Sequence, residues 1–178
     1  MNPGALGHAW FVKELKWVAN ADSEINALTN FEPRNMAIID QRFKSKLSGV
    51  NPQFDSTASI VLTHYQPNEV DYKTQTSNDQ LAVFSEIYYE HGWQAYIDGK
   101  PVDHVRANYV LRAMRVPAGA HEIKFKFEPH DYYLTQKIAL AGSSLIALLF
   151  VAFSIIGLRK MKDSEPPVSP NKNKKVGS

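Results

Sequence analysis

The residues best suited to chemistry are Trp93, Arg106, Asn108 and Tyr109, which share one short stretch of the sequence. Sugar rings present apolar C–H faces that stack on aromatic rings, while arginine and asparagine bind hydroxyl groups. This combination indicates contact with a glycan or a lipid headgroup. Aromatic residues on strands more often pack in a core or across strands, so packing is the main alternative. The same stretch contains three further tyrosines, Tyr88, Tyr89 and Tyr96.

Other combinations of polar residues give weaker indications of catalysis or metal binding. On an extended strand Glu86 and Glu90 would lie about 13 Å apart, too far to share a proton, and His91 adds only a loop residue. His121 with His130–Asp131 could supply ligands, but metal ligands usually come three or four together with supporting partners. The sequence has no serine elbow and no glycine-rich phosphate loop. We therefore expect no catalytic residue, no metal and no cofactor in this chain.

Composition narrows the class of protein. The chain has 178 residues, which suits one domain with an appendage, and it contains no cysteine. A disulfide scaffold and a cysteine-ligated metal site are therefore excluded. Its 20 basic and 18 acidic residues give a net charge of only +2, and within 1–137 basic and acidic residues are mixed without a basic stripe. Nucleic-acid binding is therefore unsupported.

An uncharged stretch of 21 residues, 138–158, dominates the C-terminal part of the chain. A helix of this length spans roughly 30 Å, the thickness of the hydrocarbon core of a bilayer. The alternative is a buried helix of a soluble protein, but such a helix usually shows a polar face. We expect 138–158 to be a transmembrane helix and the lipid bilayer to be a partner.

The flanks of this stretch predict its orientation. Arg159 and Lys160 follow it directly, whereas Lys137 stands almost alone before it. The positive-inside rule then places the C-terminus in the cytoplasm and 1–137 outside, as an extracytoplasmic domain of the bacterial inner membrane. The basic tail 159–178 is rich in Pro, Ser and Lys, and we expect it to be disordered.

Two tyrosines, Tyr132 and Tyr133, precede the apolar stretch and suit an aromatic belt at the membrane interface. The N-terminal residues show no charged leader followed by an apolar core, so export of 1–137 needs an explanation. The chain is either tail-anchored with a cytoplasmic domain or the C-terminal piece of a longer polytopic protein. We favour the second.

The pattern of residues in 1–137 is typical of a β-rich domain. Alternating apolar residues predict strands, and Asp98-Gly99 predicts a hairpin with a type I′ turn. We expect a mainly β fold, an antiparallel β-sandwich of jelly-roll or Ig-like type with a short N-terminal helical region, followed by one transmembrane α-helix. The expected elements are a strand or short helix at 10–18, a helix at 22–28, a loop at 43–54, and strands at 36–40, 60–65, 70–76, 80–89, 93–97, 108–116 and 121–128.

Several motifs resemble the C-terminal extracytoplasmic module of YfhO-type bacterial membrane proteins. They include Gly92-Trp93, Asp98-Gly99-Lys100, Arg106-Ala107-Asn108 and Val116-Pro117-Ala118-Gly119 within 83–129, and the opening NPGALGHAWFV of residues 2–12. The apolar stretch resembles the last transmembrane span of that family. The resemblance covers nearly all of the chain except the polar tail.

The resemblance implies a polytopic membrane protein with a glycosyltransferase-C-like membrane region. Members are linked to transfer of sugars from polyprenyl-phosphate donors to cell-envelope polymers. The multi-helix region and its acidic catalytic residue have no counterpart here, so this chain would be an accessory module. Its implied partners are an envelope glycan or that membrane region. The alternative is a non-enzymatic, membrane-anchored interaction domain of the envelope.

Overall fold

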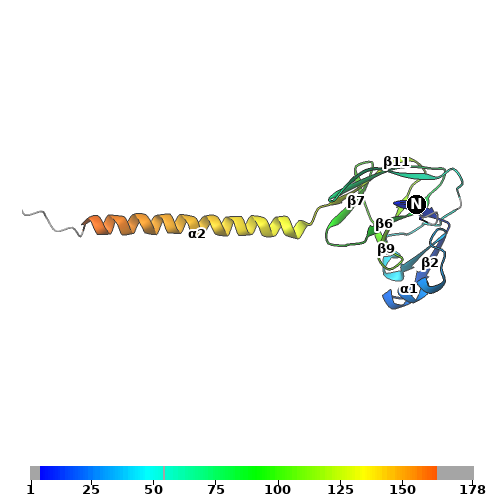
Figure 1. Cartoon of the computed structure of the whole chain (residues 1–178), viewed down its shortest axis with the longest axis horizontal. Helices are drawn as coiled ribbons and strands as arrows, with labels where there is room; N and C mark the ends of the chain where they lie inside the picture. Colours follow the sequence, from blue (N-terminus) through cyan, green and yellow to red (C-terminus); the bar gives the residue numbers. More distant parts are fainter. Residues whose placement is uncertain (1–4, 54, 164–178) are drawn as a thin grey trace, which may run out of the picture. The chain divides into compact units, whose positions relative to one another are not determined.

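The computed structural model describes residues 5–53 and 55–163, with the side chains of 130–134 and 161–163 excluded. The chain divides into two compact units, one up to His130 and one from Asp131 onward. Strands are the main regular structure of the first unit, and the described part of the second unit is one helix (Figure 1). The mainly β class with one long C-terminal helix is therefore confirmed.

The strands, in chain order, are β1 (Ala9–Val12), β2 (Glu14–Val18), β3 (Met36–Asp40), β4 (Ser59–Gln66), β5 (Glu69–Thr76), β6 (Gln80–Ile87), β7 (Trp93–Ile97), β8 (Lys100–Val102), β9 (Val105–Ala107), β10 (Leu111–Val116) and β11 (Gly119–Phe127). The helices are α1 (Ala21–Ala27), the 3-10 turns η1 (Leu28–Asn30) and η2 (Gln41–Phe43), and α2 (His130–Asp163).

Two antiparallel sheets pack as a sandwich. One has the strand order β1-β6-β10-β9 and the other β4-β5-β11-β7-β8. Their facing sides share one core, to which Phe84 and Met114 contribute from the first sheet and Tyr72 and Phe125 from the second. The Phe84 and Phe125 rings meet edge to face with centroids 4.9 Å apart, which locks the two sheets together. The predicted antiparallel sandwich is confirmed.

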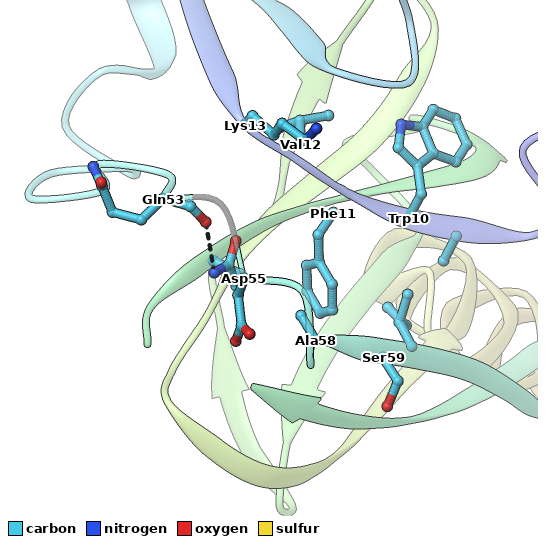
Figure 2. A pocket seen from close by; sticks show the side chains of 11 residues that line it. Trp10, Phe11, Val12, Lys13, Gln53, Asp55, Ala58 and Ser59 are labelled. Carbon is cyan, nitrogen blue, oxygen red and sulfur yellow. Dashed lines mark hydrogen bonds between the residues drawn. The ribbon is translucent and has the colours of Figure 1, made fainter. Parts of the chain in front are cut away.

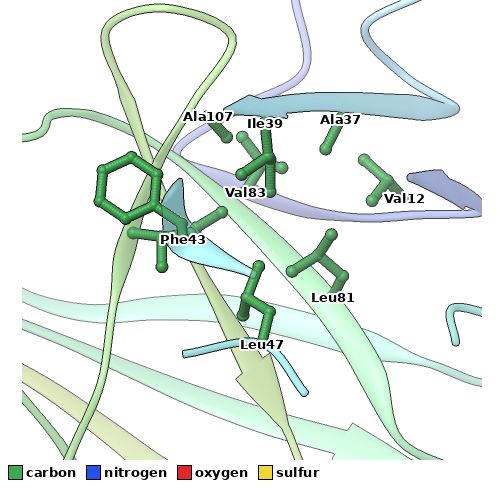
Figure 3. Close-up of a cluster of buried hydrophobic side chains, with 10 residues drawn as sticks. Val12, Ala37, Ile39, Phe43, Leu47, Leu81, Val83 and Ala107 are labelled. Atoms are coloured by element: carbon green, nitrogen blue, oxygen red, sulfur yellow. The ribbon is translucent and has the colours of Figure 1, made fainter. Parts of the chain in front are cut away.

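A third layer, which the sequence pattern did not reveal, covers the other face of the four-stranded sheet. It consists of α1, η2 and the parallel pair β2–β3. Ile39, Phe43 and Leu47 from this layer pack with Leu81 and Val83 of β6 (Figure 3). Because β6 is covered on both faces, its first five residues are all buried, which explains its continuous apolar run.

The structure corrects the predicted bounds of two elements, at 10–18 and at 108–116. The stretch 10–18 forms two strands, β1 and β2, because the chain passes at Lys13 from the four-stranded sheet to the third layer. The strand expected at 108–116 begins only at Leu111, since Asn108 and Tyr109 both have positive φ and form the turn before it. The predicted Asp98-Gly99 hairpin is confirmed, with positive φ at both residues.

The helix α2 is apolar around its whole circumference. Its stretch Thr135–Lys160 is long and apolar enough to cross a membrane. The hydroxyl groups of Ser143, Ser144 and Ser154 each donate to the carbonyl oxygen four residues earlier, which satisfies them without a polar partner.

The helix extends beyond 138–158 at both ends, from His130 to Asp163, and Arg159 and Lys160 lie in it. Tyr132 and Tyr133 lie on its first turn, and their side chains are outside the described part. The tail beyond Asp163, which we expected to be disordered, also lies outside the described residues.

Candidate functional site

A polar pocket of about 220 Å³ lies beside Trp93, and we call it the Trp93 pocket. The loop before β7 contributes Tyr88 and Glu90, and the connection from β8 to β9 contributes Asp103 and His104. The remaining lining residues are Lys46, Gln94 and Val102. The pocket thus combines aromatic rings with several charged and amide groups.

The indole of Trp93 is held in place from two sides. The guanidinium carbon of Arg112 lies 4.1 Å from its ring centroid, and the Phe127 ring lies 5.5 Å away in an edge-on arrangement. Arg112 is itself fixed, since its Nε donates to the Ile87 carbonyl oxygen at 2.9 Å. A side chain at Gly92 would clash with the Phe127 ring, so this glycine permits the close packing at the edge of the pocket. Trp93 is therefore a preorganised aromatic wall.

His104 forms a second wall and is uncharged at neutral pH. Its ring lies 5.4 Å from that of Tyr88 and 5.7 Å from that of Phe125. Burial lowers the pKa of His104 to about 4, and the nearby charge of Arg112 contributes in the same direction. The buried Nε2 atom has no hydrogen-bond partner among the described residues.

The other lining groups suit a polyhydroxylated ligand. Lys46 Nζ lies 3.9 Å from a carboxylate oxygen of Asp103, both side chains being well exposed. Glu90 and Gln94 add further acceptors and donors at the rim. Burial raises the pKa of Tyr88, so its hydroxyl stays protonated. Aromatic faces beside carboxylate and amide groups are what stacking and hydroxyl recognition of a sugar require.

Of the other predicted contact residues, Arg106 and Tyr109 bind a carboxylate and Asn108 binds the backbone of β3, and none of them lines the Trp93 pocket. Arg106 Nη2 donates to Glu24 Oε2 at 2.6 Å, and the Tyr109 backbone N–H donates to Glu24 Oε1 at 2.8 Å. The guanidinium also lies 5.3 Å from the Tyr109 ring centroid. Asn108 is buried and exchanges hydrogen bonds with the backbone of Ile38, through its Oδ1 and its own N–H.

This second cluster connects the third layer to the sandwich. Glu24 lies on α1 and is fully buried, while Arg106 lies on β9, 82 residues later. Sequence reasoning missed Glu24, because an acid in the first turn of a short helix looks like a solvated residue. Among the described contacts, none joins Trp93 to Arg106, Asn108 or Tyr109. The four predicted residues thus belong to two separate places, and their role as a glycan contact stays a prediction.

The acidic and histidine candidates are also separated. Glu90 lines the Trp93 pocket, whereas Glu86 lies on β6, where its charge favours protonation of Arg112. His91 packs edge-on to Tyr89. No group of three or more His, Asp or Glu residues in the described part of the chain is placed to hold a metal ion.

His121 has a structural partner at the Asp98-Gly99 hairpin. Its Nδ1 lies 2.6 Å from Asp98 Oδ2, and its Nε2 lies 3.2 Å from the Ala118 carbonyl oxygen. Asp98 also accepts from the Glu122 backbone N–H at 2.9 Å. These bonds raise the pKa of His121 and lower that of Asp98. The pair therefore fastens the hairpin to β11.

A larger cavity of about 360 Å³ opens between the edge strands β1 and β4, where Phe11 faces Ala58 and Ser59 (Figure 2). Its main polar groups are already bonded within the protein. Gln80 Nε2 donates to the Gln53 carbonyl oxygen, and Asp55 accepts from Ser77 and Thr57. This cavity is the open edge of the sandwich and offers less to a ligand than the Trp93 pocket.

Comparisons with known proteins give one family match and one curated relative. Residues 41–139 match the family model described as "Bacterial membrane protein YfhO". The chain is 24% identical over 125 residues to a Bacillus subtilis (strain 168) protein named "Uncharacterized protein YfhO". That match covers 70% of this chain but only 14% of the relative. No solved structure matches.

Proposed function

The chain belongs to the YfhO family of bacterial membrane proteins, and from this premise we propose that it acts as an extracytoplasmic, glycan-binding module. In this proposal it is the C-terminal part of a polytopic protein that transfers sugars from a polyprenyl-phosphate donor to a cell-envelope polymer. The module holds the acceptor polymer, and a membrane region elsewhere in the longer protein carries out the transfer.

Membrane attachment follows from the family and from α2. The helix has exposed apolar side chains on all sides, which is stable only in a surrounding of lipid or other protein. Arg159 and Lys160 lie at the C-terminal end of its apolar stretch. By the positive-inside rule, this end faces the cytoplasm and the sandwich faces outward from the inner membrane.

The observation that carries the glycan proposal is the Trp93 pocket. Trp93 is a rigid aromatic wall, and exposed carboxylate and amide groups stand beside it at Glu90, Gln94 and Asp103. A sugar ring stacked on the indole would bring its hydroxyl groups to those side chains. The pocket is polar and open, which suits one residue of a long polymer.

Binding to an isolated polymer tests this proposal. The detergent-solubilised full chain is passed over immobilised envelope polysaccharide from Bacillus subtilis, and affinity is compared between variants. Gln94→Ala and Asp103→Ala should each weaken binding by roughly tenfold, because each removes a hydrogen bond of about 1.5 kcal/mol. Gln75→Ala, an exposed position on β5, is the matched control. Equal affinity of all three variants and the parent chain would refute the pocket as the binding site.

A further inference from the structure

The last strand before α2, β11, ends at the same end of the sandwich as β6, where β7 and β10 begin. Phe127, the last residue of β11, pairs with Trp93, the first residue of β7. On the neighbouring sheet Ile87, the last residue of β6, pairs with Leu111, the first residue of β10. The Tyr88 backbone N–H donates to the Val110 carbonyl oxygen at 2.8 Å, which joins the two loops of this sheet. This is the end from which the chain continues into the apolar helix.

The same end carries an exposed apolar surface, which we call the apolar rim. It consists of Ile87, Tyr89, Val110 and Phe127, which are 70%, 52%, 47% and 37% exposed. Within the rim the Tyr89 and Phe127 rings stack with centroids 6.5 Å apart, and the loops of Ile87 and Val110 are hydrogen-bonded neighbours.

Exposed apolar residues are rare elsewhere in this unit. Tyr65 and Tyr109 flank the rim at the same end of the strands. Among the other described residues of the sandwich unit, only Ile25 and Val61 are large, apolar and exposed. Scattered exposed apolar residues are ordinary, but a concentration at one end marks a contact surface.

We propose that the apolar rim rests in the interfacial region of the lipid bilayer. The proposal relies on membrane anchoring by α2 and is independent of glycan binding. Only seven residues, 128–134, lie between Phe127 and Thr135, where the apolar stretch of α2 begins. At no more than about 3.5 Å per residue, this connection keeps the end of β11 within roughly 30 Å of the hydrocarbon core.

The chemistry of the rim favours lipid as its occupant. Aromatic and aliphatic side chains together are typical of segments that lie at the headgroup boundary. The exposed charged residues next to the rim in sequence are acidic, since Glu90 follows Tyr89 and Glu128 follows Phe127, whereas the neighbouring Arg112 is buried. Acidic residues do not attract anionic lipid, so the contact between the rim and the bilayer depends on burial of apolar surface.

Single-cysteine labelling can test this contact because the chain contains no cysteine. An environment-sensitive fluorophore is attached to the full chain in phosphatidylcholine nanodiscs, after Tyr89→Cys or Val110→Cys. Val61→Cys and Ala120→Cys are matched controls, being exposed apolar positions away from the rim. Lipid carrying a spin label near its headgroup should quench the two rim probes and shift their emission to the blue. It should leave both control probes unchanged.

Other outcomes would overturn the proposal. Rim probes that respond like the controls, or that iodide in the water quenches equally, would show that the rim faces solvent. Rim probes shielded from both lipid and iodide would show that protein covers the rim, such as a second copy of the chain. Quenching that appears only after addition of phosphatidylglycerol would show that charge drives the contact. A chain that does not bind glycan would still give the same fluorescence results, so this test and the glycan-binding test can fail independently.

Discussion

Two arginines at paired positions on neighbouring strands have opposite surroundings. Arg106 on β9 and Arg112 on β10 are cross-strand partners in the four-stranded sheet. Arg106 reaches the buried carboxylate of Glu24 and forms a direct ion pair at 2.6 Å. Arg112 is only 2% exposed and forms no ion pair with any residue that the structure describes, and its charge lies over the rings of Trp93 and Phe125.

The difference shows how one sheet uses charge for two purposes. At Arg106 opposite charges join the third layer to the sandwich, and neither is tolerated alone in a buried site. At Arg112 the aromatic rings replace a carboxylate, while Nη1 has no hydrogen-bond partner among the described residues. Burial accordingly lowers the pKa of Arg112 to about 10. The first arginine holds layers together, and the second shapes the Trp93 pocket at some cost in stability.

The largest effect is expected from breaking the ion pair. Arg106→Met leaves Glu24 as a buried, unpaired carboxylate, which should lower the free energy of unfolding by about 3–5 kcal/mol. Urea unfolding of the detergent-solubilised chain, followed by tryptophan fluorescence, measures this change. Arg115→Met is the control, since it breaks the exposed pair with Asp79 and should cost no more than about 1 kcal/mol. Similar losses in both variants would show that Glu24 is not truly isolated from water.

Acidic pH should lower the stability of the domain through protonation linked to His104, which lies close to Arg112. His104 has a folded pKa of about 4, below its ordinary value of 6.5, so the unfolded chain takes up a proton first as the pH falls. Stability should therefore decrease between about pH 6.5 and pH 4, by up to about 3 kcal/mol. His104→Gln should flatten this part of the profile of unfolding free energy against pH.

His121 provides the contrasting control for that experiment. Its pKa is raised by Asp98, so its contribution to stability is complete below the ordinary value and is lost as the pH rises through the raised one. His121→Gln should therefore leave the acid-side decrease in place. An unchanged acid profile in His104→Gln would contradict the assignment of that decrease to His104.

The local elements of this molecule could be predicted from the sequence, because their signals are local. The alternation over 121–128 predicted β11, and Asp98-Gly99 predicted the hairpin between β7 and β8. The two-strand path of 10–18 could not be predicted, since periodicity does not show where a chain leaves one sheet for another. Contacts between residues distant in sequence, such as Glu24 with Arg106, also leave no pattern.

The candidate site could be predicted only in part from the sequence, for the same reason. Trp93 could be chosen from its residue type, and it does line a polar pocket. Its other walls come from separate loops, and His104 looked isolated in the sequence. Asn108 and Tyr109 were expected on a strand, but their positive φ turns them toward α1 and β3. Only the three-dimensional structure separates the two clusters.

A smaller effect is expected from removing the aromatic face over Arg112. Trp93→Leu keeps an apolar side chain but loses the cation–π contact, which should cost about 2 kcal/mol in this desolvated site. Urea unfolding can still be followed through Trp10 and Trp17. Trp17→Leu, monitored through the other two tryptophans, is the control for loss of an indole elsewhere. A loss no larger than that of the control would show that the guanidinium gains little from the ring.

The smallest effect is expected at Arg112 itself, and it distinguishes the two arginines most sharply. Arg112→Met removes the hydrogen bond to the Ile87 carbonyl oxygen, but it also removes a buried charge with a free Nη1. Replacement of buried charge by an apolar side chain of similar size is often neutral, so the free energy of unfolding should change by less than about 1 kcal/mol. In this background Trp93→Leu should cost less than in the parent chain, because the two residues no longer interact. A loss as large as that of Arg106→Met would mean that Arg112, too, holds its layers together.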